Sequence, residues 1–128
     1  MSVKLYRYLL AIFLLTETSN TYSKNYFDSL LTYVQTLDAE QQVNTINNIP
    51  FDKMNSNAIA AINIYKKGID IAKTSGKIEQ LATSYEKIAV AYYYNGDYDL
   101  SVQSALEAIK QFEKINNHKK VGAVYASL

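Results

Sequence analysis

The chain has 128 residues, of which 48% are hydrophobic and 20% are charged, and its formal net charge is +1. This length and composition indicate one globular domain at most and exclude a disordered chain. The absence of cysteine excludes disulfides and thiolate metal sites, and a single histidine excludes a metal site built from several histidines. The sequence has no stripe of basic residues, so nothing in it indicates nucleic-acid binding. We therefore expect neither a metal site nor a cofactor.

Residues 1–23 have the layout of a secretory signal peptide. Lys4 and Arg7 precede the apolar run Leu9 to Leu15, and a small, polar stretch follows it. Because the run is much shorter than the roughly 20 residues that span a membrane, we expect an exported bacterial protein, periplasmic or extracellular, with no span after cleavage at Ser23. A buried N-terminal helix and an uncleaved membrane anchor are the alternatives.

Residues 24–56 are expected to form two short helices and a connector. Apolar residues at helical spacing predict the first helix over residues 25–37 and the second over residues 38–50. Pro50 ends the second helix, because the residue before a proline avoids the helical region. Residues 51–57 then form the connector.

Longer amphipathic helices are expected over residues 57–74, 77–95, 98–115 and 118–128. Ser56 or Asn57 is suited to cap the first of them, and Gly76 to end it in a left-handed conformation. No segment alternates with period two, so no sheet is expected. The residues predicted to face inward from the segment 98–115 are Tyr98, Val102, Ala105, Leu106, Ile109 and Phe112.

The chain aligns with itself when it is shifted so that Ile69 falls on Ile109 and Tyr85 on Tyr125. At this shift small residues generally meet small ones and bulky ones meet bulky ones. The shift is a period of about 40 residues, which is typical of stacked helical hairpins, in which each unit buries its apolar face on the next.

The segment Tyr85 to Ile109, "YEKIAVAYYYNGDYDLSVQSALEAI", resembles the tetratricopeptide repeat (TPR). The resemblance implies an all-α fold of antiparallel helical hairpins stacked as a right-handed superhelix over residues 57–128. Ser101 and Ala105 depart from the usual alanine and aromatic residue of the second helix. The matching residues are Tyr85, Ile88, Ala89 and Tyr92 in the first helix, "NGDYD" in the turn, and Ala108-Ile109 in the second helix.

The resemblance also implies a function, which is to bind a protein or peptide without catalysis. Some family members hold a C-terminal carboxylate with lysine and asparagine, but Glu86 and Val90 stand at those positions, so no such clamp is expected. For Tyr93 and Tyr94, packing against neighbouring residues is the alternative to contact with a partner in the groove. The positions that match the inner groove of the family are Thr83, Glu86, Val90, Tyr93 and Tyr94.

Other residues of the turn "YYYNGDYD" are assigned to structure. Asp97 and Asp99 lie at a helix start, where carboxylates cap the backbone and favour the helix dipole, and we prefer this role to acid–base chemistry. Tyr98 is expected to pack beneath the turn, and His118 to be exposed. We therefore predict that the chain is not an enzyme and has no catalytic residues.

The N-terminal half also resembles, more loosely, the exported front end of bacterial TPR-containing regulators, through "DSLL" at Asp28 to Leu31. This gives an alternative function, a sensory fragment of a histidine kinase or transcriptional regulator whose output module is absent. The chain ends inside an expected helix, which indicates a truncated array. In a truncated array the apolar face of this helix would be partly bare, and its residues are Val121, Val124, Tyr125 and Leu128. The alternative is that another chain covers this face through self-association.

Overall fold

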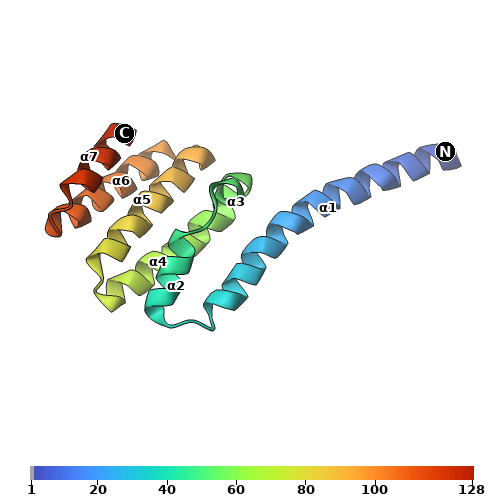
Figure 1. The fold of residues 1–128 in the computed structure, drawn as a ribbon. Helices are drawn as coiled ribbons and strands as arrows, with labels where there is room; N and C mark the ends of the chain where they lie inside the picture. Colours follow the sequence, from blue (N-terminus) through green and yellow to red (C-terminus); the bar gives the residue numbers. More distant parts are fainter. Residues whose placement is uncertain (1) are drawn as a thin grey trace.

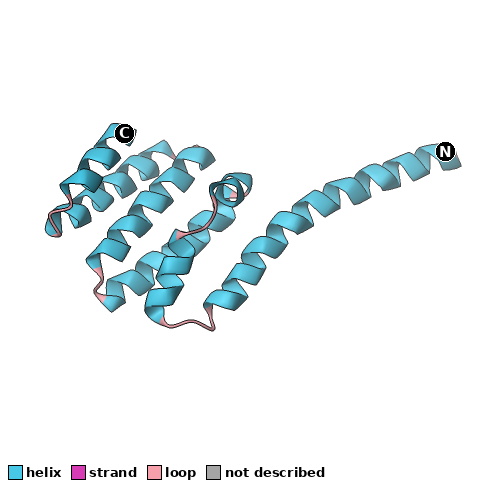
Figure 2. Cartoon of the chain, viewed as in Figure 1, coloured by secondary structure: helices cyan, strands magenta, loops and turns pink. Residues whose placement is uncertain are grey.

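A computed structural model describes residues 2–128, with the exception of the side chains of residues 13–25. All regular secondary structure in this described part of the chain is helical, in agreement with the predicted all-α class (Figures 1 and 2). In chain order the helices are α1 (Val3–Val34), α2 (Ala39–Asn47), α3 (Phe51–Ser56), α4 (Ala58–Ser75), α5 (Ile78–Asn95), α6 (Tyr98–Lys114) and α7 (His118–Ser127).

Helix α1 is longer than the sequence predicted. The prediction placed a polar stretch between the apolar run and a helix over residues 25–37, whereas the backbone is continuously helical over Val3–Val34. The sequence has no glycine or proline before Pro50, so nothing in this stretch breaks a helix. The N-terminal half of α1 projects away from the other helices (Figure 1), and the described side chains of residues 2–12 are exposed.

The body of the protein begins where the end of α1 meets α2. The short helix α2 starts with a capping box, in which Asp38 Oδ1 accepts from the Gln41 amide at 2.8 Å and Gln41 Oε1 accepts from the Asp38 amide at 3.3 Å. Helix α2 ends at Asn47, before it reaches Pro50, and the expected connector after Pro50 is itself helical and forms α3. Pro50 favours this helix, because its fixed φ is suited to the position just before a helix starts.

The remaining helices recur at a regular distance along the chain. The start of α6 follows the start of α4 by the same number of residues as the start of α7 follows the start of α5. This number equals the period found in the sequence. Gly76, Gly96 and Asn116 lie at the three short connections, with φ of 71°, 87° and 55°. In each case this left-handed residue ends a helix and lets the chain reverse direction. Consecutive helices are therefore antiparallel neighbours.

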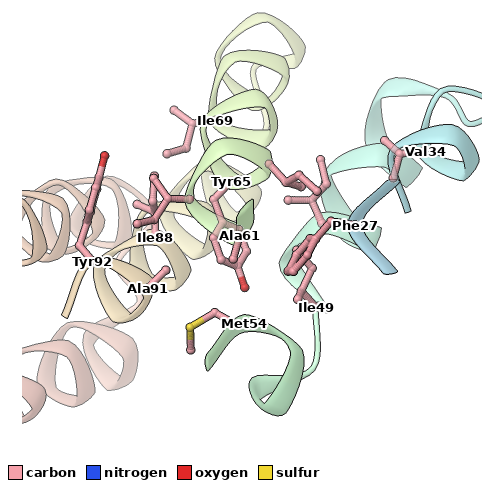
Figure 3. Packing of buried hydrophobic residues seen from close by; sticks show 13 residues of the cluster. Phe27, Val34, Ile49, Met54, Ala61, Tyr65, Ile69, Ile88, Ala91 and Tyr92 are labelled. Atoms are coloured by element: carbon pink, nitrogen blue, oxygen red, sulfur yellow. The ribbon is translucent and has the colours of Figure 1, made fainter. Parts of the chain in front are cut away.

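The core consists of two clusters of buried side chains. The larger one joins α1, α2, α3, α4 and α5, and Figure 3 shows Ala61 and Tyr65 of α4 between Phe27 and Ile49 on one side and Ile88 on the other. Tyr65 is only 2% exposed, and this burial raises the pKa of its phenol to about 12. The smaller cluster joins α5, α6 and α7 and consists of Ala82, Ala89, Ala105, Ala108, Ile109, Phe112 and Val124.

Glycine at position 68 lets two helices approach closely. A Cβ built on Gly68 of α4 would lie 3.1 Å from Cγ2 of Ile46 on α2, and Ile46 is almost fully buried. This contact is shorter than the optimal separation of two carbon atoms. The crossing of α2 and α4 therefore depends on the missing side chain.

Three of the residues predicted to face inward from α6 do not do so. Tyr98 is 61% exposed, Val102 is 46% exposed and Leu106 is 48% exposed. The inner face of α6 instead consists of Ala105, Ala108, Ile109 and Phe112, which contact α5 and α7. The prediction that Tyr98 packs beneath its turn was thus wrong, because the turn is closed by Gly96 and leaves the ring outside.

Candidate binding surface

Helix α5 carries all five residues predicted to bind a partner, and the structure divides them between two hollows. Thr83 lies in the first, which we call the polar groove. It has a volume of about 550 Å³ and lies between α2, α5 and the start of α7. It is lined by Glu40, Asn44, Asn47, Asn48, Lys77, Glu79, Gln80, Thr83, Lys87 and Lys120.

Polar side chains join α2 to α5 along the polar groove. At one end Lys77 forms an ion pair with Glu40. One turn further along, Nε2 of Gln80 donates a hydrogen bond of 2.9 Å to Oδ1 of Asn44. These contacts fix the two helices side by side, although residues of α4 separate them in the sequence.

The same set of contacts continues into the protein interior. The hydroxyl of Ser84 is fully buried and lies 2.9 Å both from Oδ1 of Asn47 and from the backbone carbonyl oxygen of Gln80. Asn47 in turn donates to the Gln80 carbonyl at 3.3 Å. A buried polar pair of this kind is costly to break, because the group left behind loses its partner.

An ion pair joins α5 to α7 in the same way. Nζ of Lys120 lies 2.9 Å and 3.2 Å from the two carboxylate oxygens of Glu86, and it also lies 5.7 Å from the centre of the Phe112 ring. The lysine thereby balances the negative charge of the Glu86 carboxylate on the side that faces α7. The pair lies at the boundary of the two hollows, since Lys120 lines the polar groove and Glu86 lines the second one.

The second hollow, the apolar groove, contains the other four predicted residues, Glu86, Val90, Tyr93 and Tyr94. It has a volume of about 280 Å³ and lies between α5, α6 and the end of α7. Val90 is 39% exposed, and both tyrosine rings are about half exposed. The remaining lining residues are Ala89, Ser101, Ala105, Ala123, Val124, Ser127 and Leu128.

The two tyrosines also belong to a row of exposed rings, which we call the aromatic edge and define as Phe51, Tyr94, Tyr93 and Tyr98. Neighbouring rings meet edge to face, with centroids 5.2 Å apart for Phe51 and Tyr94, 5.4 Å for Tyr94 and Tyr93, and 5.5 Å for Tyr93 and Tyr98. Sequence reasoning missed Phe51 and assigned Tyr98 to packing. A phenylalanine directly after Pro50 in an expected connector was the available signal.

Both carboxylates of the turn lie at the helix start as predicted, with Asp99 in the first turn of α6, but the expected side-chain cap does not form. Asp97 occupies the position before α6, but its side chain accepts no hydrogen bond from the helix, and its Oδ2 accepts from Nδ2 of Asn95 at 2.7 Å. His118 is exposed at the start of α7. Among the side chains that the structure describes, no group of three or more histidine, aspartate or glutamate residues is placed to hold a metal ion.

The face of α7 that was expected to be partly bare is partly exposed. Val124 is buried against α5 and α6, whereas Tyr125 and Leu128 are more than half exposed. Among the described residues, no helix combines the length and the apolar character needed to cross a membrane.

Comparison of the chain with known protein families, with curated proteins and with solved structures yields no match.

Proposed function

We propose that this chain is a non-catalytic scaffold that binds a protein or peptide, built as a short TPR-like superhelix. The regular recurrence of helix starts supports the repeat, with α4 and α6 as equivalent helices and α5 and α7 as another equivalent pair. The polar contacts from α2 to α5 and from α5 to α7 support a row of these helices along one face.

The observation that carries the proposal is the apolar groove. It is lined mainly by small or apolar side chains, and four of the five residues expected to bind a partner meet in it. Val90 and the tyrosines are exposed there although α5 also has a fully packed face, on which Ala91 and Tyr92 are buried. Apolar hollows with a few polar groups at the rim are typical binding sites, and tyrosine supplies contact area with a hydroxyl at small entropic cost.

A displayed library of random peptides, selected on the full chain, tests this function. Selected peptides are synthesised, and their affinities are measured by calorimetry. We expect Val90→Asp to weaken binding at least about tenfold, because it places a charge in an apolar hollow. Ile59→Asp is the matched control, since Ile59 is an exposed apolar residue of α4 outside this groove.

The proposal is rejected if no peptide is enriched, or if Val90→Asp and Ile59→Asp change affinity equally. A substrate turned over by the chain would reject its non-catalytic character.

We further propose that residues 1–23 are an export signal and that the scaffold acts outside the cytoplasm. Lys4 and Arg7 in front of the apolar run support this. The test is to fuse residues 1–30 to a phosphatase that is active only after export. Activity should appear with the native segment and disappear with Leu14→Arg, and export that survives this change would contradict the proposal.

A further inference from the structure

The aromatic edge concentrates exposed apolar surface in one place. Its four rings come from α3, α5 and α6 and are between 49% and 61% exposed. Each ring contacts the next one edge to face, so the row is held in a fixed arrangement by its own members. Single exposed aromatic residues are ordinary on a protein surface, but a contiguous row of them marks an interaction site.

The packing of the fold does not require these rings. Tyr92, their neighbour on α5, is buried in the larger core cluster, while Tyr93 and Tyr94 turn outward. Phe51 and Tyr98 are the first residues of α3 and α6, and both rings are more than half exposed. The row therefore has no evident role inside the body of the protein.

Acidic residues lie at both ends of the row, but the one beside Phe51 is paired with a lysine. Asp52 follows Phe51 directly, and Asp97 and Asp99 lie on both sides of Tyr98. The lysine next to Asp52 lies 3.8 Å from its carboxylate and 5.7 Å from the centre of the Tyr26 ring. The ion pairs between described side chains involve neither Asp97 nor Asp99.

A row of ring faces with carboxylates at its side has a definite complement. Arginine and lysine are attracted to the face of an aromatic ring, and arginine also stacks on it through its planar guanidinium group. The same cation is attracted to a nearby carboxylate. An acidic or purely apolar partner would gain from the rings but would leave the carboxylates unpaired or repelled.

We propose that the aromatic edge binds a basic segment of a partner protein, whose arginine or lysine side chains lie against the rings beside Asp97 and Asp99. This inference rests on the proposed scaffold function and names the chemistry of the partner. Tyr93 and Tyr94 line the apolar groove as well. An apolar residue next to the basic one in the partner would therefore enter the apolar groove while the cation stays at the edge.

The test uses dye-labelled peptides of alternating arginine and leucine, with two matched peptides that carry glutamate or the neutral analogue citrulline in place of arginine. Binding to the full chain is followed by fluorescence anisotropy at low and high salt. We expect the arginine peptide to bind at least about tenfold more tightly than either matched peptide, and less tightly at high salt.

Variants of the chain locate the site. Tyr98→Leu keeps an apolar side chain but removes the ring, and we expect it to weaken the arginine peptide by about 2- to 5-fold. The double variant Asp97→Asn/Asp99→Asn should weaken binding and reduce its salt dependence. Tyr33→Leu is the control, because Tyr33 is 56% exposed on α1 and takes part in none of the ring contacts of the row. All the replaced side chains lie outside the core, and circular dichroism checks that each variant is folded.

The inference is overturned if the arginine and glutamate peptides bind equally, if neither binds, or if Tyr33→Leu weakens binding as much as Tyr98→Leu. Library peptides that depend on Val90 but not on the rings or on arginine would overturn it while leaving the scaffold function intact. If peptide binding depends on the rings of the aromatic edge but not on Val90, the apolar groove is rejected as a binding site and the present inference stands.

Discussion

Replacing Gly68 by alanine tests the close approach between α2 and α4. The added Cβ would lie 3.1 Å from Cγ2 of Ile46, whereas carbon atoms pack best at about 3.5–4.0 Å. Ile46 is 1% exposed and is surrounded by the larger core cluster, so it has little room to move aside. We therefore expect Gly68→Ala to push α2 and α4 apart or to force Ile46 out of its rotamer.

The magnitude follows from two opposing effects. In an unobstructed helix, glycine to alanine stabilises the fold by roughly 0.5–1 kcal/mol, because alanine loses less backbone entropy. Overpacking a buried contact costs about 1–3 kcal/mol. Gly68→Ala should thus lower the free energy of unfolding by up to about 2 kcal/mol. Gly122 of α7 has no neighbouring atom within 4 Å of an added Cβ, so Gly122→Ala should raise it by about 0.5–1 kcal/mol.

Urea unfolding, followed by far-ultraviolet circular dichroism, measures both variants at a common m-value. A third variant, Gly68→Ala with Ile46→Leu, removes the branched methyl group that the Cβ would meet and should recover part of the loss relative to Ile46→Leu alone. If Gly68→Ala stabilises the protein as much as Gly122→Ala does, the crossing of α2 and α4 is not tight, and the reasoning is refuted.

Three further substitutions test other contacts. Because burial raises the pKa of Tyr65 to about 12, the stability of the native chain should fall between about pH 10 and pH 12. Tyr65→Phe should show a smaller fall in urea unfolding, and equal slopes would contradict this. Lys120→Ala removes the ion pair to α5 and should cost about 0.5–1 kcal/mol and speed amide exchange in α7, whereas the exposed Lys119→Ala should change neither. Asn47→Ala breaks a buried hydrogen bond and should cost about 1–3 kcal/mol, against less than about 0.5 kcal/mol for the exposed Asn48→Ala, as chemical denaturation will show.

Local signals in the sequence were sufficient to locate the helices of the repeat. Gly76 and Gly96 end α4 and α5 as expected, because glycine adopts the left-handed conformation that a helix end requires. On α5, Ala82, Ile88 and Tyr92 recur at helical spacing, and all three are buried. These features depend on residues close together in the chain.

Features that depend on distant partners could not be predicted in this way. The spacing of Val102 and Leu106 places them on one side of α6, but it does not tell whether another helix covers that side. The pairing of Asn47 with Ser84 and of Phe51 with Tyr94 joins residues from different helices. Periodicity predicts on which face of its helix a residue lies, but not which residue of another helix it contacts. The polar contacts and the aromatic edge are therefore visible only in the folded structure.

The left-handed residues Gly76 and Asn116 have a consequence for how such a chain can change its length. They are separated by one full period of the repeat, have the same backbone conformation, and each stands shortly before a helix start, at Ile78 and His118. A duplication or deletion bounded by these positions would join matching ends and keep every helix in register. An insertion of one or two residues inside a helix would rotate its apolar face away from the core. We expect a chain with this spacing of helices to gain or lose length in whole periods.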